Sequence, residues 1–234
     1  MRTLTLCVIA SFATFATQTP ESDIRIMRIG EHHEDEVSLA DEGHWLALVP
    51  GGVDSFLKPA HVSILPVHDE LDDDPNSLNG RRVIADITPD PMLLLRGEVF
   101  RDGKISTVTS APLDIPIGEP LTLGPVEFFL QLQDSSLSDG QRQYRFALRL
   151  REGEVQQVVA TYDGYLGHSQ TIVPAAEHFP LLLWAGDLDG DHRIDFVLDT
   201  SNHYNVDEVT LFLSSQAPKG SLVKAVAVSR RVGC

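Results

Sequence analysis

The sequence has few cysteines, few aromatic residues and few basic residues for its length. Of 234 residues, two are cysteines, 7% are aromatic and 18 are lysine or arginine, against 34 aspartates and glutamates. The formal charge of −16 repels nucleic-acid phosphates and anionic membrane surfaces, so we expect neither as a partner. Hydrophobic residues make up 42% of the chain, which is enough for an ordinary core and excludes a disordered chain.

Long apolar runs are missing except at the beginning of the chain, which reads "MRTLTLCVIASFATFATQTP". Arg2 is followed by an apolar run from Leu4 to about Phe15 and then by small residues, the layout of a secretory signal peptide cleaved after Ala16. No later run reaches the ~18 to 20 residues that a membrane span needs. We therefore expect residues 1–16 to be removed and the mature protein to be secreted or periplasmic.

The two cysteines cannot form an intramolecular disulfide if the chain is exported in this way. Cys7 lies in the signal peptide and leaves with it, so only Cys234 remains. A single exported cysteine fits an intermolecular bridge, a free thiol, or a small end group packed against the fold.

Long amphipathic helices are also missing, and the apolar residues recur mostly at every second position. In "YRFALRL", residues 144–150, one face carries Tyr144, Phe146, Leu148 and Leu150. Short turns containing glycine separate such segments, as between neighbouring antiparallel strands. The pattern predicts a mainly β protein with antiparallel sheets, either a sandwich or two small β domains, with little helix apart from the signal peptide. The predicted strands are 45–49, 61–67, 144–150, 155–162, 209–213 and 223–228.

A proline-rich stretch, residues 112–125, interrupts the predicted strands and reads as an extended connection. We place a domain boundary there, between an N-terminal β region at 17–118 and a C-terminal β region at 119–234. A single helical turn is predicted at 174–179, "PAAEHF".

Five of the sixteen residues in "WAGDLDGDHRIDFVLD", residues 184–199, are aspartates. Asp187, Asp189, Asp191 and Asp195 occupy positions 1, 3, 5 and 9 of one short segment, where their charges repel. A tightly curled loop presents alternate side chains inward, and Ca²⁺ takes ~6 to 8 oxygen ligands. The spacing therefore predicts a Ca²⁺ site in which the cation removes the repulsion.

The backbone carbonyl of Arg193, at position 7, is the expected fifth protein ligand of this site. Position 12 is Leu198 rather than the glutamate of an EF-hand, and apolar residues flank the loop at strand-like spacing. We therefore expect the loop to join two strands rather than two helices.

The segment "GDLDGDHRIDFVLD" resembles the calcium loop of FG-GAP/VCBS-type β-repeats. That family has Gly-Asp-x-Asn/Asp-Gly-Asp-Gly-x-x-Asp before an apolar strand, and the likeness implies Ca²⁺ binding by the matching aspartates. His192 stands where the family has a glycine, at a point that often needs positive φ. The loop occurs once, so a propeller of repeats is not expected. The residues that match are Gly186, Asp187, Asp189, Gly190, Asp191 and Asp195.

The aspartates have two other interpretations. The stretch "LLLWAGDLDGD" resembles the motif of haloacid-dehalogenase-type phosphatases, but Asp191 replaces its threonine and only 43 residues follow (234 − 191), reading as β. A solvated acidic turn without a cation is the other alternative. The segment from "LLWAGDLDGD" to the terminal "GC" also looks like uncharacterised secreted bacterial proteins, which bears on localisation alone.

Three further polar stretches are weaker candidates. "EHHEDE" at 31–36 lacks the His-Glu-x-x-His spacing of zinc proteases, and the acids of "HDELDDD" at 68–74 are consecutive rather than alternating. Both read as solvated loops, with a second metal site near His32–Glu36 or Asp69–Asp74 left open. In "SNHYN" at 201–205, hydrogen bonding within a turn is favoured over a contact with the cation.

Familiar catalytic motifs are not present: the chain has no Gly-x-Ser-x-Gly elbow, P-loop or Cys-x-x-Cys. A glycosidase needs only two suitably spaced carboxylates, and 34 acidic residues are compatible with one. We interpret the chain as a secreted, calcium-binding interaction module for an extracellular protein or glycan. The alternative is an extracellular hydrolase of a polymer, with Ca²⁺ stabilising its fold.

Overall fold

The computed structural model describes residues 23–233, apart from residues 34, 53, 70, 75, 139–140, 167–171, 175 and 177–178. The predicted signal peptide and both cysteines lie outside the described residues. So do three residues of the helical turn predicted at 174–179.

Strands dominate the molecule, with about 61% strand and 2% helix, which confirms the predicted mainly β, antiparallel class. The larger sheet has twelve strands: β1 (Arg25–Met27), β2 (Gly30–His32), β3 (Gly43–Gly51), β4 (Asp54–Val67), β5 (Gly80–Ala85), β6 (Leu93–Arg96), β7 (Gly103–Thr109), β8 (Leu113–Asp114), β14 (Leu181–Asp187), β15 (Asp195–Asp199), β16 (Val206–Leu213) and β17 (Lys224–Val232). The smaller sheet has five: β9 (Leu121–Leu123), β10 (Val126–Ser138), β11 (Gln141–Glu152), β12 (Val155–Leu166) and β13 (Ile172–Pro174). All six segments predicted as strands lie in or overlap these strands.

The two halves of the chain share the larger sheet. Its order runs β1-β6-β3-β4-β7-β14-β15-β16-β17, so that β7 from the first half pairs with β14 from the second. The five-stranded sheet is formed by the segment between β8 and β14. The proline-rich stretch at 112–125 holds the short strands β8 and β9, which pair with different sheets.

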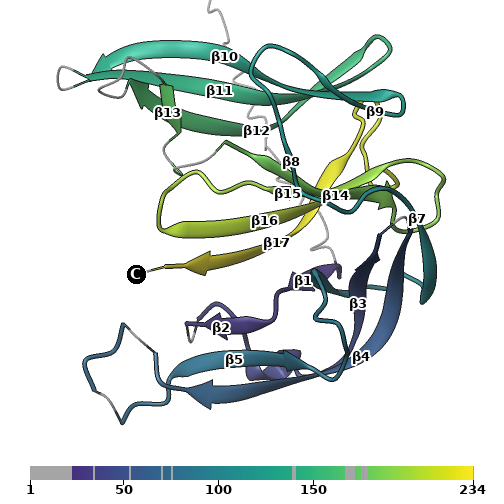
Figure 1. Cartoon of the computed structure of the whole chain (residues 1–234), viewed down its shortest axis with the longest axis vertical. Coiled ribbons are helices and arrows are strands. Elements are labelled where there is room, and N and C mark those ends of the chain that lie inside the picture. The colour runs from purple at the N-terminus through teal and green to yellow at the C-terminus, as the bar shows by residue number, and fades with distance from the viewer. Residues whose placement is uncertain are drawn as a thin grey trace, which may run out of the picture.

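Strands β14 to β17 form a middle layer, with the five-stranded sheet on one side and the N-terminal strands on the other (Figure 1). Alternate side chains of this layer enter two different cores. Trp184 and Val197 pack toward the N-terminal strands, whereas Ala185 and Phe196 pack toward the five-stranded sheet. Burial on both faces explains why β15 has no exposed residue.

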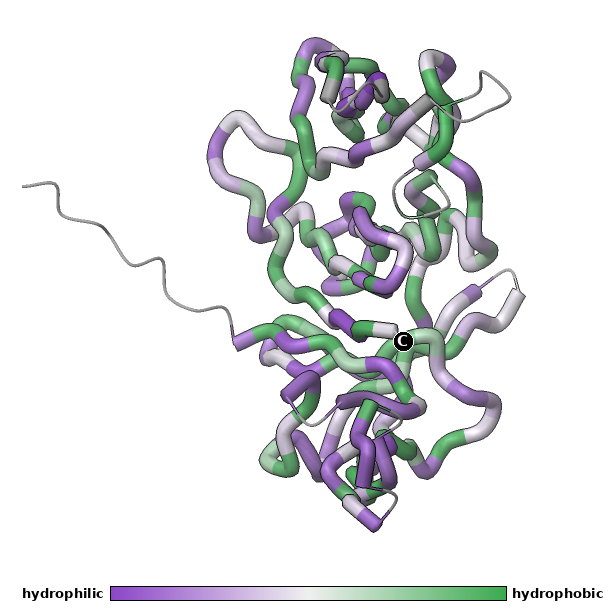
Figure 2. Tube along the Cα trace, turned by 90° about the vertical axis from the view of Figure 1, so that its left-hand side faces the viewer, coloured by the Kyte–Doolittle hydropathy of each residue, from purple (hydrophilic) through white to green (hydrophobic). Residues whose placement is uncertain are grey.

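The rest of the hydrophobic pattern follows the alternation expected of strands. Apolar and polar residues alternate along much of the trace (Figure 2). The hairpin between β3 and β4 turns at Gly52, whose φ of 83° suits glycine. A single 3-10 turn, η1 (Leu39–Asp41), is the described helical element, and Ser38 caps it. Within the described residues, no helix is long and apolar enough to cross a membrane.

Candidate metal centre

The aspartate-rich segment is the connection between β14 and β15, two paired antiparallel strands of the middle layer. This agrees with the expected strand-to-strand loop. Gly186 is fixed by packing, because a Cβ there would lie 2.4 Å from the Ser106 carbonyl oxygen of β7 and 2.7 Å from the Trp184 ring. The close approach of β7 therefore holds the start of the loop in place.

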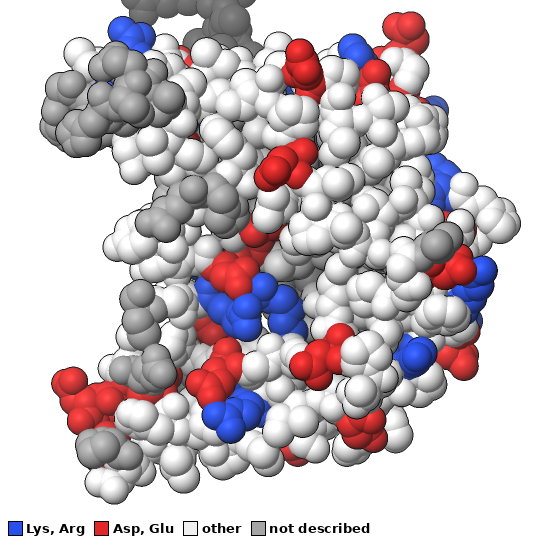
Figure 3. All heavy atoms as spheres, viewed as in Figure 1, with Lys and Arg blue, Asp and Glu red and all other residues white. Residues whose placement is uncertain are grey.

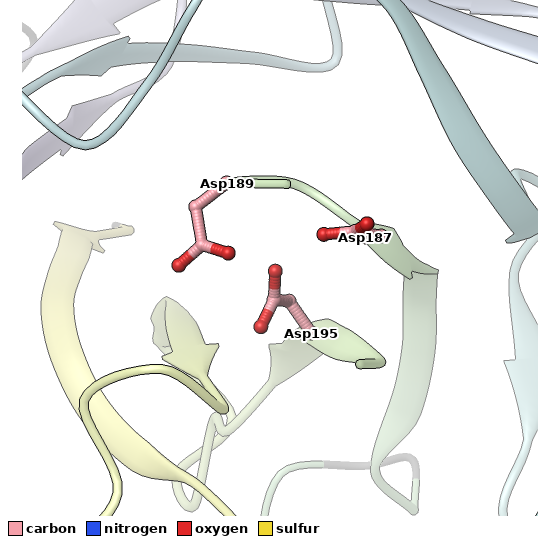
Figure 4. A group of neighbouring side chains, drawn as sticks. All are labelled: Asp187, Asp189 and Asp195. Carbon is pink, nitrogen blue, oxygen red and sulfur yellow. The ribbon is translucent and has the colours of Figure 1, made fainter. Parts of the chain in front are cut away.

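Three of the four predicted aspartates come together. One carboxylate oxygen from each of Asp187, Asp189 and Asp195 lies within 4.8 Å of the others. Figure 4 shows the three carboxylates directed toward a common point, from the end of β14, the loop and the start of β15. Asp191 is not in this group: its Oδ2 accepts a hydrogen bond from Ser214 Oγ at 2.9 Å, and its Oδ1 accepts one from the Arg193 amide at 2.8 Å.

The carboxylate of Asp187 folds the loop around itself. Its Oδ1 accepts the Gly190 amide at 2.8 Å, and its Oδ2 accepts the His192 amide at 3.0 Å. Asp189 Oδ1 accepts the Asp191 amide at 3.3 Å in the same manner. Such contacts from an aspartate to an amide a few residues ahead stabilise tight turns, and they curl this loop toward its carboxylates.

The curl places His192 in the left-handed region, with φ of 67°. It is the one non-glycine residue with positive φ in the described part of the chain, which confirms the expectation drawn from the missing glycine. Histidine occupies this region at a cost of roughly 1 kcal/mol or more. Gly190, with φ of 82°, adopts it without that cost.

Asp195 is the buried member of the group, with 0% of its surface exposed. Its Oδ2 accepts the Leu188 amide at 2.8 Å, and its Oδ1 accepts the Ser214 amide at 2.8 Å and Ser214 Oγ at 3.0 Å. Burial raises the pKa of Asp195 to about 7, with a smaller contribution from the charge of Asp189; the hydrogen bonds only partly oppose this. The charged form of Asp195 is therefore short of positive partners at neutral pH.

The charged form of Asp189 is destabilised in the same way. Burial raises its pKa, and the charges of Asp191 and Asp187 add to the effect, while hydrogen bonds from Ser215 Oγ and the Asp191 amide oppose it. No lysine or arginine is within ion-pair distance of Asp189 or Asp195 among the described residues. A cation at the centre of the three carboxylates would supply the missing charge.

Sequence reasoning missed the two serines that complete this arrangement. Ser214 and Ser215 follow β16, about twenty residues beyond the loop, and their hydroxyls donate to Asp191, Asp195 and Asp189. Nothing in "LSSQA" singles out these serines, because only the pairing of β15 with β16 carries them to the loop.

Arg193 has a role that the sequence did not predict. Its guanidinium donates to the Ser214 carbonyl at 3.3 Å and to the Leu222 carbonyl at 3.2 Å, which ties the loop to the connection between β16 and β17. That the backbone carbonyl of Arg193 is a ligand of the cation stays a prediction.

The structure places the three weaker candidate stretches in different surroundings. In "SNHYN" at 201–205, His203 Nδ1 contacts Asn205 Oδ1, so the predicted bonding within a turn is confirmed. The stretches at 31–36 and 68–74, expected to be solvated loops, meet each other: His33 Nδ1 lies 2.8 Å from both carboxylate oxygens of Asp69.

Comparison of the chain with protein-family models, with curated proteins and with solved structures finds no match. The likeness to FG-GAP/VCBS calcium loops therefore rests on the loop residues alone.

Proposed function

We propose that this chain is an exported, calcium-binding interaction module whose aspartate loop, residues 187–195, holds one structural Ca²⁺ ion. The observation that carries the proposal is the convergence of the Asp187, Asp189 and Asp195 carboxylates on one point, with Asp195 fully buried. Three like charges held so closely are costly unless a cation lies between them.

The donor set favours Ca²⁺ over other cations. Every candidate ligand atom is an oxygen, which suits a hard cation and not the nitrogen and sulfur preference of Zn²⁺. Three carboxylates, the serine hydroxyls, the Arg193 carbonyl and water offer enough oxygens for ~6 to 8 ligands, whereas Mg²⁺ demands a smaller octahedron.

Bound Ca²⁺ would stabilise the middle layer at one end. The ion would join the end of β14 to the beginning of β15, and Ser214 would extend the connection to the end of β16 through Asp195. Because this layer contributes to two cores, its order affects both sides of the molecule. A structural role for the ion follows from this position.

The loop aspartates are suited to a structural role and not to catalysis. A catalytic carboxylate has to reach a substrate, whereas Asp195 is fully buried and all the loop aspartates accept hydrogen bonds from the protein. A hydrolase whose catalytic carboxylates lie elsewhere, with Ca²⁺ stabilising its fold, stays the alternative. The phosphatase alternative requires a large α/β domain after its aspartate, and β15 to β17 follow here instead. The expected partner is an extracellular protein or glycan.

Export is tested by sequencing the N-terminus of protein recovered outside the cytoplasm. We expect a mature chain that begins near Thr17, because the charged start, apolar run and small residues precede it. Equilibrium dialysis of the same material should give one Ca²⁺ per chain. A product that retains Met1 would contradict export, and a chain that takes up no Ca²⁺ would contradict the metal site.

A further inference from the structure

A second group of metal-ligand side chains lies where three distant segments meet. A pocket of about 240 Å³ is bordered by residues of β2 and the loop after it, by the end of β4 and by the end of β17. Acidic and basic side chains gather between the level of β17 and the level of β2 (Figure 3). Glu31, His32, Glu36, His68, Asp69 and Arg231 are among the lining residues.

His32 lines this pocket, and one of its ring nitrogens is buried without a hydrogen-bond partner. Its Nε2 lies 2.9 Å from the Arg28 carbonyl, and since a carbonyl only accepts, Nε2 must carry the hydrogen. Nδ1 of the neutral ring then has a free lone pair. The side chain is 1% exposed, and Nδ1 makes no hydrogen bond.

The atom that Nδ1 faces is also an acceptor. Glu36 Oε2 lies 3.5 Å away, and the Glu36 carboxylate, 8% exposed, is held by the amides of His33 and Val232. Two lone pairs that face each other in a buried place repel unless a positive charge lies between them.

We propose that His32 Nδ1 and Glu36 Oε2 are two ligands of a second metal site, one that takes a borderline divalent transition metal such as Zn²⁺. Zinc bonds to histidine nitrogen and carboxylate oxygen are ~2.0 to 2.2 Å long, and at a tetrahedral angle they put the two ligand atoms about 3.4 Å apart. The 3.5 Å separation matches this value and is too long for a good hydrogen bond.

The surroundings of both ligands support the site. Metal-binding histidines usually donate their other ring N–H to a carbonyl or carboxylate, as His32 does to Arg28. Glu36 is likewise oriented by two backbone amides. Arg231 lines the same pocket and opposes a cation, but Asp207 pairs with Arg231 at 2.7 Å and with Arg28 at 2.8 Å.

Water would fill the remaining coordination positions. Asp69 and His68 line the pocket, and His33 holds Asp69 at 2.8 Å while its Nε2 donates to the Val232 carbonyl at 2.7 Å. A metal bound here would join the end of β17 to the loop after β2. The site differs from the aspartate loop in position, in donor type and in metal class.

Zn²⁺ titration against a competing chromogenic chelator tests the proposal, with the full-length protein in millimolar Ca²⁺ to occupy the aspartate loop. We expect about tenfold or more weaker Zn²⁺ binding in His32→Gln, which keeps a donor near the Arg28 carbonyl, and in Glu36→Gln. His61→Gln is the matched control, because His61 and His44 contact each other on β3 and β4, away from the pocket. The same titration on Asp189→Ala should give an unchanged affinity.

Equal Zn²⁺ affinity in wild type and His32→Gln, or loss of binding in His61→Gln, would overturn the site. If the variants fail to fold, nitrogen NMR of the wild-type histidines decides. Zn²⁺ should shift the Nδ1 signal of His32 from that of an unprotonated nitrogen. A His32 Nδ1 that is already protonated at neutral pH, or that does not respond to saturating Zn²⁺, would show that a proton holds the pair instead.

Discussion

The aspartate loop and the His32–Glu36 pocket bury polar groups in opposite ways. In the loop, three carboxylates within nine residues converge without a basic partner in contact with Asp189 or Asp195. In the pocket, the two proposed ligands are four residues apart in the chain, but Glu36 is oriented by the Val232 amide from a segment about two hundred residues away, and Arg231 is paired with Asp207. The loop therefore holds negative charge that a cation would neutralise. The pocket has ligand atoms positioned for a cation but little excess negative charge.

The largest expected difference between the two regions is in their response to pH. Asp195 has a pKa of about 7 in the folded protein, against ~3.9 when unfolded, so the folded state holds its proton more tightly. Stability from this group is present below pH ~4 and is lost as pH rises to about 7. At about 1.4 kcal/mol for each pKa unit, the loss is on the order of 4 kcal/mol. Urea unfolding in chelator from pH 4 to 8 measures it.

Calcium should reverse this loss above pH 7, because the ion takes the place of the proton at Asp195. In the pocket, His33 contributes a loss in the same direction. Burial lowers the pKa of His33, but the hydrogen bond that His33 donates to Asp69 and the nearby acidic charges outweigh this and raise it. The stabilising effect of His33 therefore disappears as pH rises through that pKa. His33→Gln should remove only this part, and Ca²⁺ should not restore it. A stability of the calcium-free protein that rises from pH 5 to 7 would contradict the account.

The next largest effect separates two neighbouring serines. Ser214 is buried and its hydroxyl donates to Asp191 and Asp195, whereas Ser215 is exposed and donates to Asp189. Ser214→Ala should cost about 1.5 to 3 kcal/mol, the range for a hydrogen bond to a charged group. Ser215→Ala, the matched control, should cost less than about 0.5 kcal/mol. Equal costs in chemical denaturation would mean that burial of Asp195 does not govern the site.

A smaller and opposite effect is expected at His192. Glycine adopts its φ of 67° without a Cβ penalty, so His192→Gly should stabilise the protein by about 1 kcal/mol and tighten Ca²⁺ binding. His203→Gly serves as the control, since His203 does not have positive φ and the substitution there should destabilise or change nothing. Thermal melts with and without Ca²⁺ check both. A destabilised His192→Gly protein would show that the loop does not hold this conformation.

The aspartate loop was predictable from sequence because its ligands are close together in the chain. Period-two alternation similarly predicted the strand at 144–150, since a half-buried strand has its own local pattern. The sequence left open a second metal site near His32–Glu36 or Asp69–Asp74, but it did not predict that the two stretches meet, because His33 reaches Asp69 and Val232 only after β4 and β17 have paired with their neighbours. Ser214 was missed for the same reason.

The order of the strands within the sheets also could not be predicted from the hydrophobic pattern. The apolar run at 181–185 indicates a buried strand, but it does not show that Trp184 and Ala185 enter different cores. The pairing of β7 with β14 joins segments about eighty residues apart, and no local signal specifies it. Long-range pairing of this kind depends on which buried faces fit one another.

Thermal melts of wild type and Asp189→Ala, in excess chelator and in several millimolar Ca²⁺, test the central claim most directly. Extracellular modules bind Ca²⁺ with a Kd of ~10⁻⁴ to 10⁻³ M, so at ~1 mM the ion adds roughly 0.4 to 1.4 kcal/mol. The melting temperature of the wild type should rise by about 2 to 4 °C for each ~1 kcal/mol, with a smaller rise in Mg²⁺. Asp189→Ala should show no Ca²⁺-dependent shift, and relief of repulsion should keep its metal-free melting temperature at or above that of the wild type. Equal Ca²⁺ shifts in the two proteins, or none in the wild type, would make these aspartates a solvated turn and not a metal site.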